Sequence, residues 1–322
     1  MRTRSTDVWH LGRWAAVGLV LTGLSSAGAS AALSRLYALK QMDMHLHCGL
    51  EREVPLSDWI DLAVKDGRKV IVALDHRELY DTTPEEHAAW VKERKFPGWY
   101  PTGMEGRRAL MDDLARLAER RDVTAFRGWE VYEGELDEKL DAETIGMAEV
   151  VGWHISPNGE VAPCGATLLK RVRQIVAVQR RFGMPMVVFH PFSMRIERVQ
   201  KDAVKRGQAV SALTAADYRF FQPGEQEELA RLLRGKPIYI EIGSGVGRYW
   251  QVPVAREALT ADIRPLAALG VRFTVSTDAH YVKHAQQPFE PDVYCAPLGV
   301  TPSNTNGLVR DLMRRRETRN RL

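Results

Sequence analysis

Cysteine is scarce in this chain of 322 residues. Only Cys48, Cys164 and Cys295 are present, which excludes a disulfide framework and a cysteine-rich zinc module and leaves at least one thiol free. An excess of charge of one sign is also missing, because 45 Lys and Arg residues face 41 Asp and Glu residues. The resulting net charge of +4 gives no argument for nucleic-acid binding. Internal repeats and low-complexity segments are absent after residue 40.

The composition is that of a folded protein. Hydrophobic residues make up 45% and charged residues 27% of the chain, which excludes disorder, collagen, a coiled coil and a polytopic membrane protein as the main state. The length suits one α/β barrel domain, which can use it without splitting into two.

The first 31 residues have the features of a signal peptide. Three arginines precede an apolar run over residues 14–24, and the small residues that follow end in Ala29-Ser30-Ala31. We therefore expect residues 1–31 to direct export to a periplasmic or external space. An uncleaved N-terminal membrane anchor is the alternative, although the apolar run is short for a spanning helix. Free cysteines in an oxidising space are a mild argument against export.

Short β-branched runs alternate with longer helical stretches over residues 40–322, which predicts one domain of parallel strands joined by crossover helices. We expect strands at 41–47, 69–75, 123–131, 149–155, 185–190, 209–213, 237–243 and 272–277. We expect helices at 57–66, 104–121, 166–182, 224–234, 256–269 and 303–316. A polar, aromatic-rich stretch at about 80–103 is expected to be an insertion over one end of the barrel.

Five of the nine histidines lie at or beside the C-terminal end of an expected strand, and those ends share one face of a parallel barrel. In the first strand, Asp43, His45 and His47 alternate and are expected to face one side. Two imidazoles so spaced can hold one metal ion, although a pair of core histidines is equally compatible with this motif alone.

Four further strand ends carry the same residue types. They are Asp75-His76, Glu130, His190-Pro191 and the pair Asp278 and His280. Each of them alone could be a turn or core residue, but the set is hard to explain by chance. A mixture of His, Asp and Glu without cysteine pairs suits Zn, Mn or Fe.

The order of these motifs resembles the PHP (polymerase and histidinol phosphatase) superfamily over about residues 40–300. Asp43-Met44-His45-Leu46-His47 is similar to its first motif, Asp75-His76 to the second and His190-Pro191 to the third. Ser276-Thr277-Asp278-Ala279-His280 is similar to the fourth, with one extra residue. The resemblance implies a distorted (β/α)7 barrel with two or three divalent metal ions at the C-terminal ends of its strands.

The resemblance also implies a ligand set. His45, His47, Glu130 and Asp278 are expected to hold the first ion, Glu130 with His190 the second, and His76 with His280 the third. Asp43 and Asp75 are expected to support ligating imidazoles from behind. The catalytic residues implied are His45, His47, Asp278 and His280.

Two ligand positions depart from the family pattern. The loop after the first motif offers Glu53 as the remaining ligand of the third ion, with Glu51 as the fallback. Where the family has a histidine on the strand after Glu130, this chain has Glu149, which we favour slightly over His154.

Several other residues have a functional and a structural interpretation. Arg195 and Arg248 could bind substrate phosphate, but a solvated helix face explains them equally well. Glu241 ends a clear strand, and a neighbour of the ligands is a better interpretation for it than a ligand. The glycine-rich residues 243–247 are interpreted as a tight turn rather than a phosphate nest.

The resemblance implies a hydrolase of small phosphate monoesters or diesters that uses a metal-activated water. An amidohydrolase-type enzyme is the first alternative, although no lysine stands at an expected strand end to bridge its metals. An exported, non-catalytic protein that retains its metals is the second. The sequence indicates no protein or nucleic-acid partner, and contact with a membrane is expected only if the N-terminal segment is uncleaved.

Overall fold

A computed structural model describes residues 36–48, 54–92, 100–117, 119–132, 142–155 and 162–321. The expected signal peptide (1–31) and the candidate ligands Glu51 and Glu53 lie outside these residues. None of the helices within the described residues is long and apolar enough to cross a membrane.

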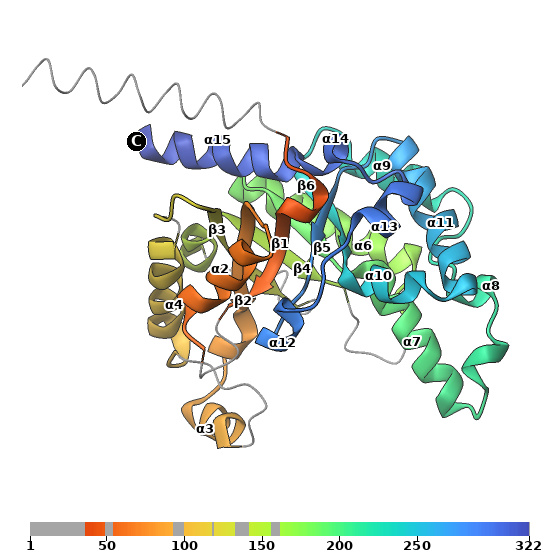
Figure 1. The fold of residues 1–322 in the computed structure, drawn as a ribbon, viewed down its shortest axis with the longest axis horizontal. Helices are drawn as coiled ribbons and strands as arrows, with labels where there is room; N and C mark the ends of the chain where they lie inside the picture. Colours follow the sequence, from red (N-terminus) through yellow and green to blue (C-terminus); the bar gives the residue numbers. More distant parts are fainter. Residues whose placement is uncertain are drawn as a thin grey trace, which may run out of the picture.

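Seven parallel strands form the centre of the molecule and follow one another around the sheet in chain order, β1 to β7 (Figure 1). They are β1 (Met42–His47), β2 (Val70–His76), β3 (Thr124–Val131), β4 (Val150–His154), β5 (Met186–Phe189), β6 (Ile238–Gly243) and β7 (Phe273–Ser276). Nearly all their residues are buried, because both faces of a parallel sheet are covered in this architecture. The expected (β/α)7 barrel is confirmed.

Helices connect the strands and cover the outside of the barrel (Figure 1). Those before β5 are α2 (Leu56–Lys65), α3 (Pro84–Lys92), α4 (Gly103–Leu117), α5 (Ala142–Met147) and α6 (Gly165–Phe182). Those between β5 and β7 are α7 (Pro191–Lys205), α8 (Ala215–Tyr218), α9 (Glu225–Leu233), α10 (Ser244–Trp250) and α11 (Pro253–Ala268). Those after β7 are α12 (Val282–Ala285), α13 (Asp292–Cys295), α14 (Pro302–Thr305) and α15 (Gly307–Arg321). Short 3-10 turns lie at Leu39–Gln41, Arg77–Tyr80, Val210–Ala212 and Ala296–Leu298.

The barrel closes where β1 meets the segment that follows β7. The Asp278 amide donates to the His45 carbonyl over 3.0 Å, and the Thr277 amide and hydroxyl donate to the Asp43 carboxylate over 2.9 and 2.7 Å. A β-bulge between Asp43 and Leu46 breaks the expected alternation, so Asp43 leaves the side taken by His45. Asp43 therefore lies at the seam of the barrel, where its carboxylate binds Thr277 and lies 3.3 Å from Arg68 Nε.

Helix α15 runs across the opposite end of the barrel, where the strands begin (Figure 1). Three of its arginines donate to carbonyl groups at the starts of strands: Arg315 to Gly183, Arg316 to Ala125 and Arg319 to Ala148. These bonds satisfy carbonyls that no ladder or helix uses. The two ends of the barrel thus differ: α15 covers the end where the strands begin, and the histidines and carboxylates lie at the end where the strands stop.

Three expected elements differ from the structure. The expected strand at 209–213 is a 3-10 turn, and its residues 209–212 are exposed because β5 pairs directly with β6 and leaves no place between them. The helix α7, which was not among the expected helices, begins at Pro191, since proline suits the first helical position. The glycine-rich residues 243–247 start α10 instead of forming a tight turn.

Candidate metal centre

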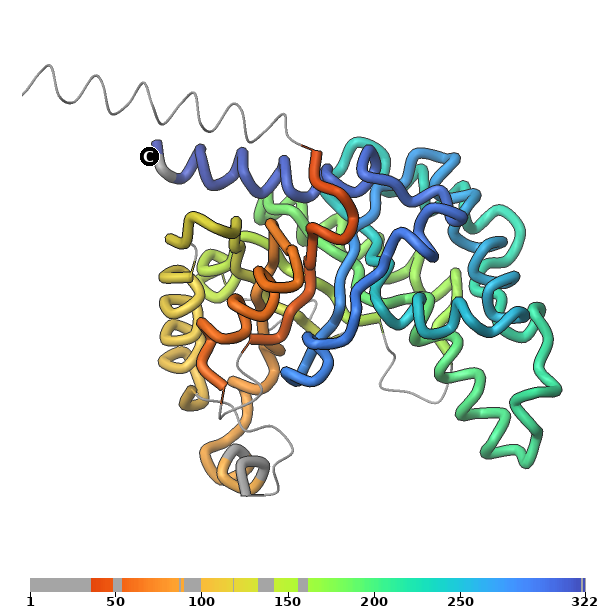
Figure 2. Tube along the Cα trace, viewed as in Figure 1, coloured from red at the N-terminus to blue at the C-terminus, as the bar shows by residue number. Residues whose placement is uncertain are grey.

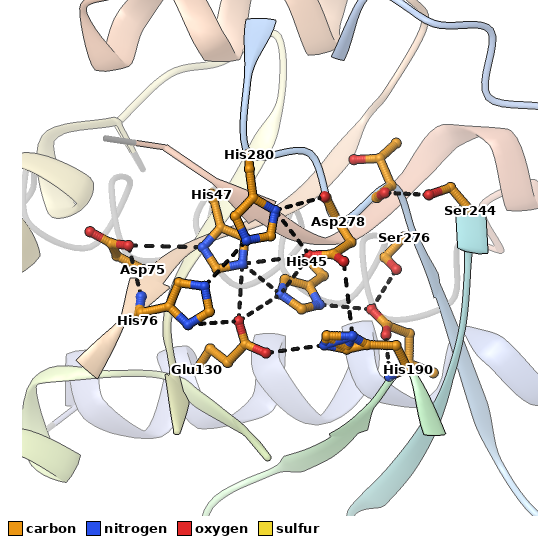
Figure 3. Close-up of polar contacts among 12 residues, drawn as sticks. His45, His47, Asp75, His76, Glu130, His190, Ser244, Ser276, Asp278 and His280 are labelled. Atoms are coloured by element: carbon orange, nitrogen blue, oxygen red, sulfur yellow. Dashed lines mark hydrogen bonds and ion pairs between the residues drawn. The ribbon is translucent and has the colours of Figure 1, made fainter. Parts of the chain in front are cut away.

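Histidines and carboxylates from all seven strands converge at the C-terminal ends of the strands (Figure 3). The cluster comprises His45, His47, His76, Glu130, His154, His190, Glu241, Asp278 and His280. Most of them are nearly or fully buried, and Asp278 and His280 are the more open members, with side chains 30% and 28% exposed. Each of these residues lies near the end of a buried strand or within the first few residues after it.

Glu130 stands at the centre of this cluster (Figure 3). One carboxylate oxygen lies 3.0 Å from His47 Nε2 and 3.3 Å from His45 Nε2, and the other lies 3.2 Å from His190 Nε2. His76 Nδ1 is 3.3 Å from the first oxygen. A single carboxylate therefore joins two groups of imidazoles, which is the arrangement of a ligand shared by two ions.

The first group contains His45, His47, Glu130 and Asp278. The Nε2 atoms of the two histidines are 2.9 Å apart, and Asp278 Oδ1 lies 3.5 and 3.6 Å from them. His45 Nδ1 is 2.9 Å from Glu241 Oε1, so the carboxylate keeps a proton on Nδ1 and Nε2 is the nitrogen that a cation would bind. Glu241 is thus the residue that orients His45.

Two members of the cluster have a strained backbone. His190 and Asp278 are the non-glycine residues with positive φ, 32° and 55°, among the described residues. Such a conformation costs about 1–3 kcal/mol each and persists only when neighbouring contacts impose it. The His190 amide donates to Glu241 Oε2 over 2.6 Å, and the Asp278 amide to the His45 carbonyl. The strained backbone at His190 and Asp278 therefore lowers the stability of the fold while it fixes the orientation of both side chains.

The second group corrects our expectation for the strand after Glu130. Glu149 precedes β4 at the opposite end of the barrel, where its carboxylate accepts two bonds of 2.7 and 2.8 Å from Arg316. His154 ends β4 and lies with Glu130 and His190 in a group whose ligand atoms are within 4.8 Å of one another. The preference for Glu149 was wrong, because the end of the strand, and not sequence alignment, decides which residue reaches the site.

The third group contains His47, His76 and His280, again within 4.8 Å. His76 Nε2 is 3.2 Å from His280 Nε2, and the His280 ring stacks on His47 with centroids 4.0 Å apart. Glu78, which the sequence analysis did not single out, places Oε1 3.1 Å from His76 Nδ1. Its position two residues past the strand end Asp75-His76 was the available signal.

Asp75 contacts the site from behind. Its carboxylate accepts bonds from the His76 amide at 2.7 Å and from the Tyr80 hydroxyl at 3.0 Å, and it lies 3.8 Å from His47 Nδ1. Asp75 is therefore buried beside the imidazoles of His47 and His76.

Proximity divides the histidines into two electrostatic classes. Burial opposes the proton on His76, but Glu130 and Glu78 outweigh it and raise the pKa of His76 to about 9. Burial lowers the pKa values of His154 and His280 to about 3, helped by His190 and His47 respectively. Burial would raise the pKa of Glu130, yet His76 and His45 hold it well below its usual range. In the metal-free chain the centre therefore combines an ionised Glu130 and a protonated His76 with unprotonated His154 and His280.

The residues fit divalent cations. His47 Nδ1, His76 Nδ1 and Asp278 Oδ1 are buried without a hydrogen-bond partner, and an unsatisfied buried polar atom is costly. Imidazole nitrogens and carboxylate oxygens are the donors that Zn, Mn and Fe accept. A shared cation would satisfy nitrogen and oxygen atoms that face one another at about 3 Å, such as His47 Nε2 and Glu130 Oε2.

A hollow of about 470 Å³ opens beside the cluster and is lined by His190, Asp278 and His280 on one side and by Arg248 and Phe289 on the other. Arg248 is exposed and lines this hollow. Arg195 does not line it, because its guanidinium donates to the Asp217 carbonyl over 3.0 Å and borders a different hollow. The expectation for Arg195 is therefore wrong.

Comparisons with known proteins show only distant similarity. No protein-family model matches the sequence, and no curated protein matches it. The chain is similar to a histidinol phosphate phosphatase from Lactococcus lactis, solved with Zn, L-histidinol and phosphate, at 14% identity over 81% of this chain and 93% of that chain, with a TM-score of 0.47. A protein proposed to be a histidinol phosphatase, from Listeria monocytogenes, is 13% identical over 79% of this chain and 100% of its own, with a TM-score of 0.49. A dihydroorotase from Campylobacter jejuni is 11% identical over 89% and 86%, with a TM-score of 0.36.

Proposed function

We propose that this chain is a metal-dependent hydrolase of phosphate esters, with two or three divalent ions of Zn, Mn or Fe. The observation that carries the proposal is Glu130, whose two oxygens lie within 3.3 Å of imidazoles from two separate groups. A hollow large enough for a small organic substrate adjoins these groups, and Arg248 lines it. A small-molecule phosphate ester is the partner that this combination fits.

The three groups name the residues that would hold the ions. The first set is His45, His47, Glu130 and Asp278; the second is Glu130, His154 and His190; the third is His76 and His280 beside His47. Divalent ions so held lower the pKa of a water and neutralise charge on a phosphoryl group.

The chain's own residues do the remaining work. Glu241 keeps the proton of His45 on Nδ1 and holds the backbone of His190, so both imidazoles keep their orientation. Arg248 is placed to bind a phosphate oxygen of the substrate in the hollow. Asp278 and His280 line the same hollow, where the ions that they would hold would stabilise the negative charge on the leaving oxygen.

The amidohydrolase alternative lacks its bridging lysine. Within the described residues, no lysine belongs to the groups of ligand atoms or lines the hollow. We also propose export through residues 1–31, either by a cleaved signal peptide or with the segment kept as an anchor. Mass spectrometry of the N-terminus of the mature protein distinguishes the two.

The test is hydrolysis of a phosphomonoester and a phosphodiester, side by side, by the full chain loaded with Zn or Mn. We expect turnover of at least one ester, loss of turnover in His190→Ala, and normal turnover in Glu149→Gln, whose carboxylate lies at the other end of the barrel. Arg248→Met is expected to raise KM more than it lowers kcat. No ester turnover by a chain shown to bind metal would overturn the proposal, and turnover of an amide panel alone would favour the amidohydrolase alternative.

A further inference from the structure

Positive charge is concentrated at the end of the barrel opposite the metal centre. The four residues that precede each strand include eight Lys or Arg and three Asp or Glu, and α15 contributes six Arg against two acids. Their combined excess is nine positive charges, whereas the whole chain has an excess of four. In a parallel barrel these segments share one end. The rest of the chain therefore carries a net negative charge.

The arginines of α15 have two roles. Arg315, Arg316 and Arg319 turn inward and bind carbonyls at the starts of strands. Arg310, Arg314 and Arg321 bind none, although Arg314, with its side chain 66% exposed, has Asp311 3.6 Å away. An exposed pair of this kind neutralises little of the local field.

Arg314 and Arg321 are exposed and Arg310 is half-buried, and other exposed basic residues lie at the same end of the barrel. Gly183, which accepts the bond from Arg315, follows the exposed pair Arg180 and Arg181 at the end of α6. We call the basic face the surface made of Lys40, Arg180, Arg181, Arg310, Arg314 and Arg321.

The start of the described chain lies at the same end. The Tyr37 amide donates to Asn306 Oδ1 over 2.8 Å and Asn306 Nδ2 donates to the Tyr37 carbonyl over 2.9 Å, and Asn306 directly precedes α15. Figure 2 shows this red segment beside the blue C-terminal helix. In the sequence, the apolar run 14–24 lies only eleven residues before Leu36, whose own side chain is exposed. The basic face is thus the face closest, along the chain, to the apolar run.

We infer that the basic face docks on the anionic phospholipid headgroups of a bilayer into which the apolar run 14–24 inserts. Juxtamembrane clusters of Lys and Arg are attracted to anionic lipid, by about 1 kcal/mol for each residue near the surface. Docking by this end turns the metal centre away from the bilayer, because the centre lies at the opposite end of the strands. The inference takes the alternative in which residues 1–31 are kept as an anchor, and it does not depend on which reaction the centre performs.

The test uses the full chain and two kinds of vesicle, phosphatidylcholine alone and phosphatidylcholine mixed with phosphatidylglycerol. The variant Arg310→Gln/Arg314→Gln/Arg321→Gln removes three charges from the basic face. The matched control, Lys201→Gln/Lys205→Gln/Arg206→Gln, removes three exposed charges from the end of α7, which projects away from α15 (Figure 1). Metal content of both variants reports that the barrel is intact.

We expect tighter binding to the anionic vesicles, a loss of about a hundredfold in the α15 variant and less than about threefold in the control. The preference for anionic vesicles should also weaken as salt is added, since the Debye length shortens. Equal binding to both vesicle types, or an equal loss in the control, would overturn the inference. Tighter binding to a mixed-sequence oligonucleotide, lost in the α15 variant, would assign the basic face to nucleic acid and overturn it as well.

Discussion

At the scale of single residues, an aromatic ring fills the barrel interior next to the metal centre. The Phe189 ring stacks on the His45 imidazole with centroids 3.7 Å apart, and it lies against the bare Cα of Gly152 on β4. A Cβ at Gly152 would stand 1.7 Å from the ring. The glycine is therefore required for the ring to occupy this place, and the ring limits how the imidazole can tilt.

Gly152→Ala is expected to lower metal affinity by about 10–100-fold, because displacing Phe189 releases His45 from its support. Metal titration by calorimetry checks this. Adding Phe189→Leu, which vacates space for the new methyl group, should restore part of the affinity. Gly146→Ala is the control, since nothing lies within 4 Å of its Cβ. An unchanged affinity in a folded Gly152→Ala protein would show that the ring does not hold His45.

Glu149 and His154 lie at opposite ends of β4 and allow a second prediction. His154→Ala should bind about one ion fewer per chain, because it removes an imidazole from the group with Glu130 and His190. Glu149→Ala should bind as many ions as the unchanged chain but have a lower free energy of unfolding, because Arg316 loses the carboxylate to which it donates. Elemental analysis and thermal unfolding of both proteins separate the outcomes. The reverse pattern would restore our original preference for Glu149.

At the scale of elements, helix α15 covers the end of the barrel where the strands begin, and its arginines bind backbone carbonyls there. Its buried residues Leu308, Val309 and Leu312 face the barrel, and its arginines reach the carbonyls beyond them. The periodicity of residues 303–316 predicted a helix here, but nothing in that pattern indicated that it would cross the end of the barrel. That placement comes from the contacts of Arg315, Arg316 and Arg319.

Arg316→Met is expected to destabilise the folded chain by about 2 kcal/mol or more, since it breaks charged bonds to Glu149 and the Ala125 carbonyl and removes the charged partner of a buried carboxylate, which keeps only the Arg127 amide as a donor among the described residues. Denaturant unfolding of the metal-free protein measures the loss. Arg314→Met, on the exposed side of the same helix, should change stability by less than about 0.5 kcal/mol. Equal effects of the two substitutions would mean that α15 is not anchored through Arg316.

At the scale of the whole molecule, the barrel brings nine polar residues from seven strands into one buried cluster. In the metal-free chain, carboxylates raise the pKa of His76 to about 9, and Glu241 and Glu130 raise that of His45 well above its usual value against the effect of burial. Both histidines are therefore protonated at pH 7 until a cation replaces the protons. In the metal-free folded chain, His45 and His76 therefore carry protons that a bound cation would displace.

Metal binding at pH 7 is expected to release about two protons per chain, from His45 and His76, because a ligating imidazole must be neutral. Affinity should accordingly rise with pH, and the part of this rise that comes from His76 should end as the pH passes about 9. Calorimetry of Zn binding in buffers of different ionisation enthalpy counts the protons. A titration that releases none at pH 7 would contradict this account, and release should shrink at pH 10.

The sequence by itself determined which residues end the strands, because apolar β-branched runs stop at polar groups and parallel strands present those ends on one face. This is why His45, His47, His76, Glu130, His190, Asp278 and His280 could all be named before any coordinates, while Glu53 lies outside the described residues. Only the tertiary structure decided the rest. The bulge that sends Asp43 to the seam, the choice of His154 over Glu149, and the bond of Glu241 to His45 all join residues far apart in sequence or depend on strand register. Local pattern carries no information about such contacts, since strand pairing and packing set them.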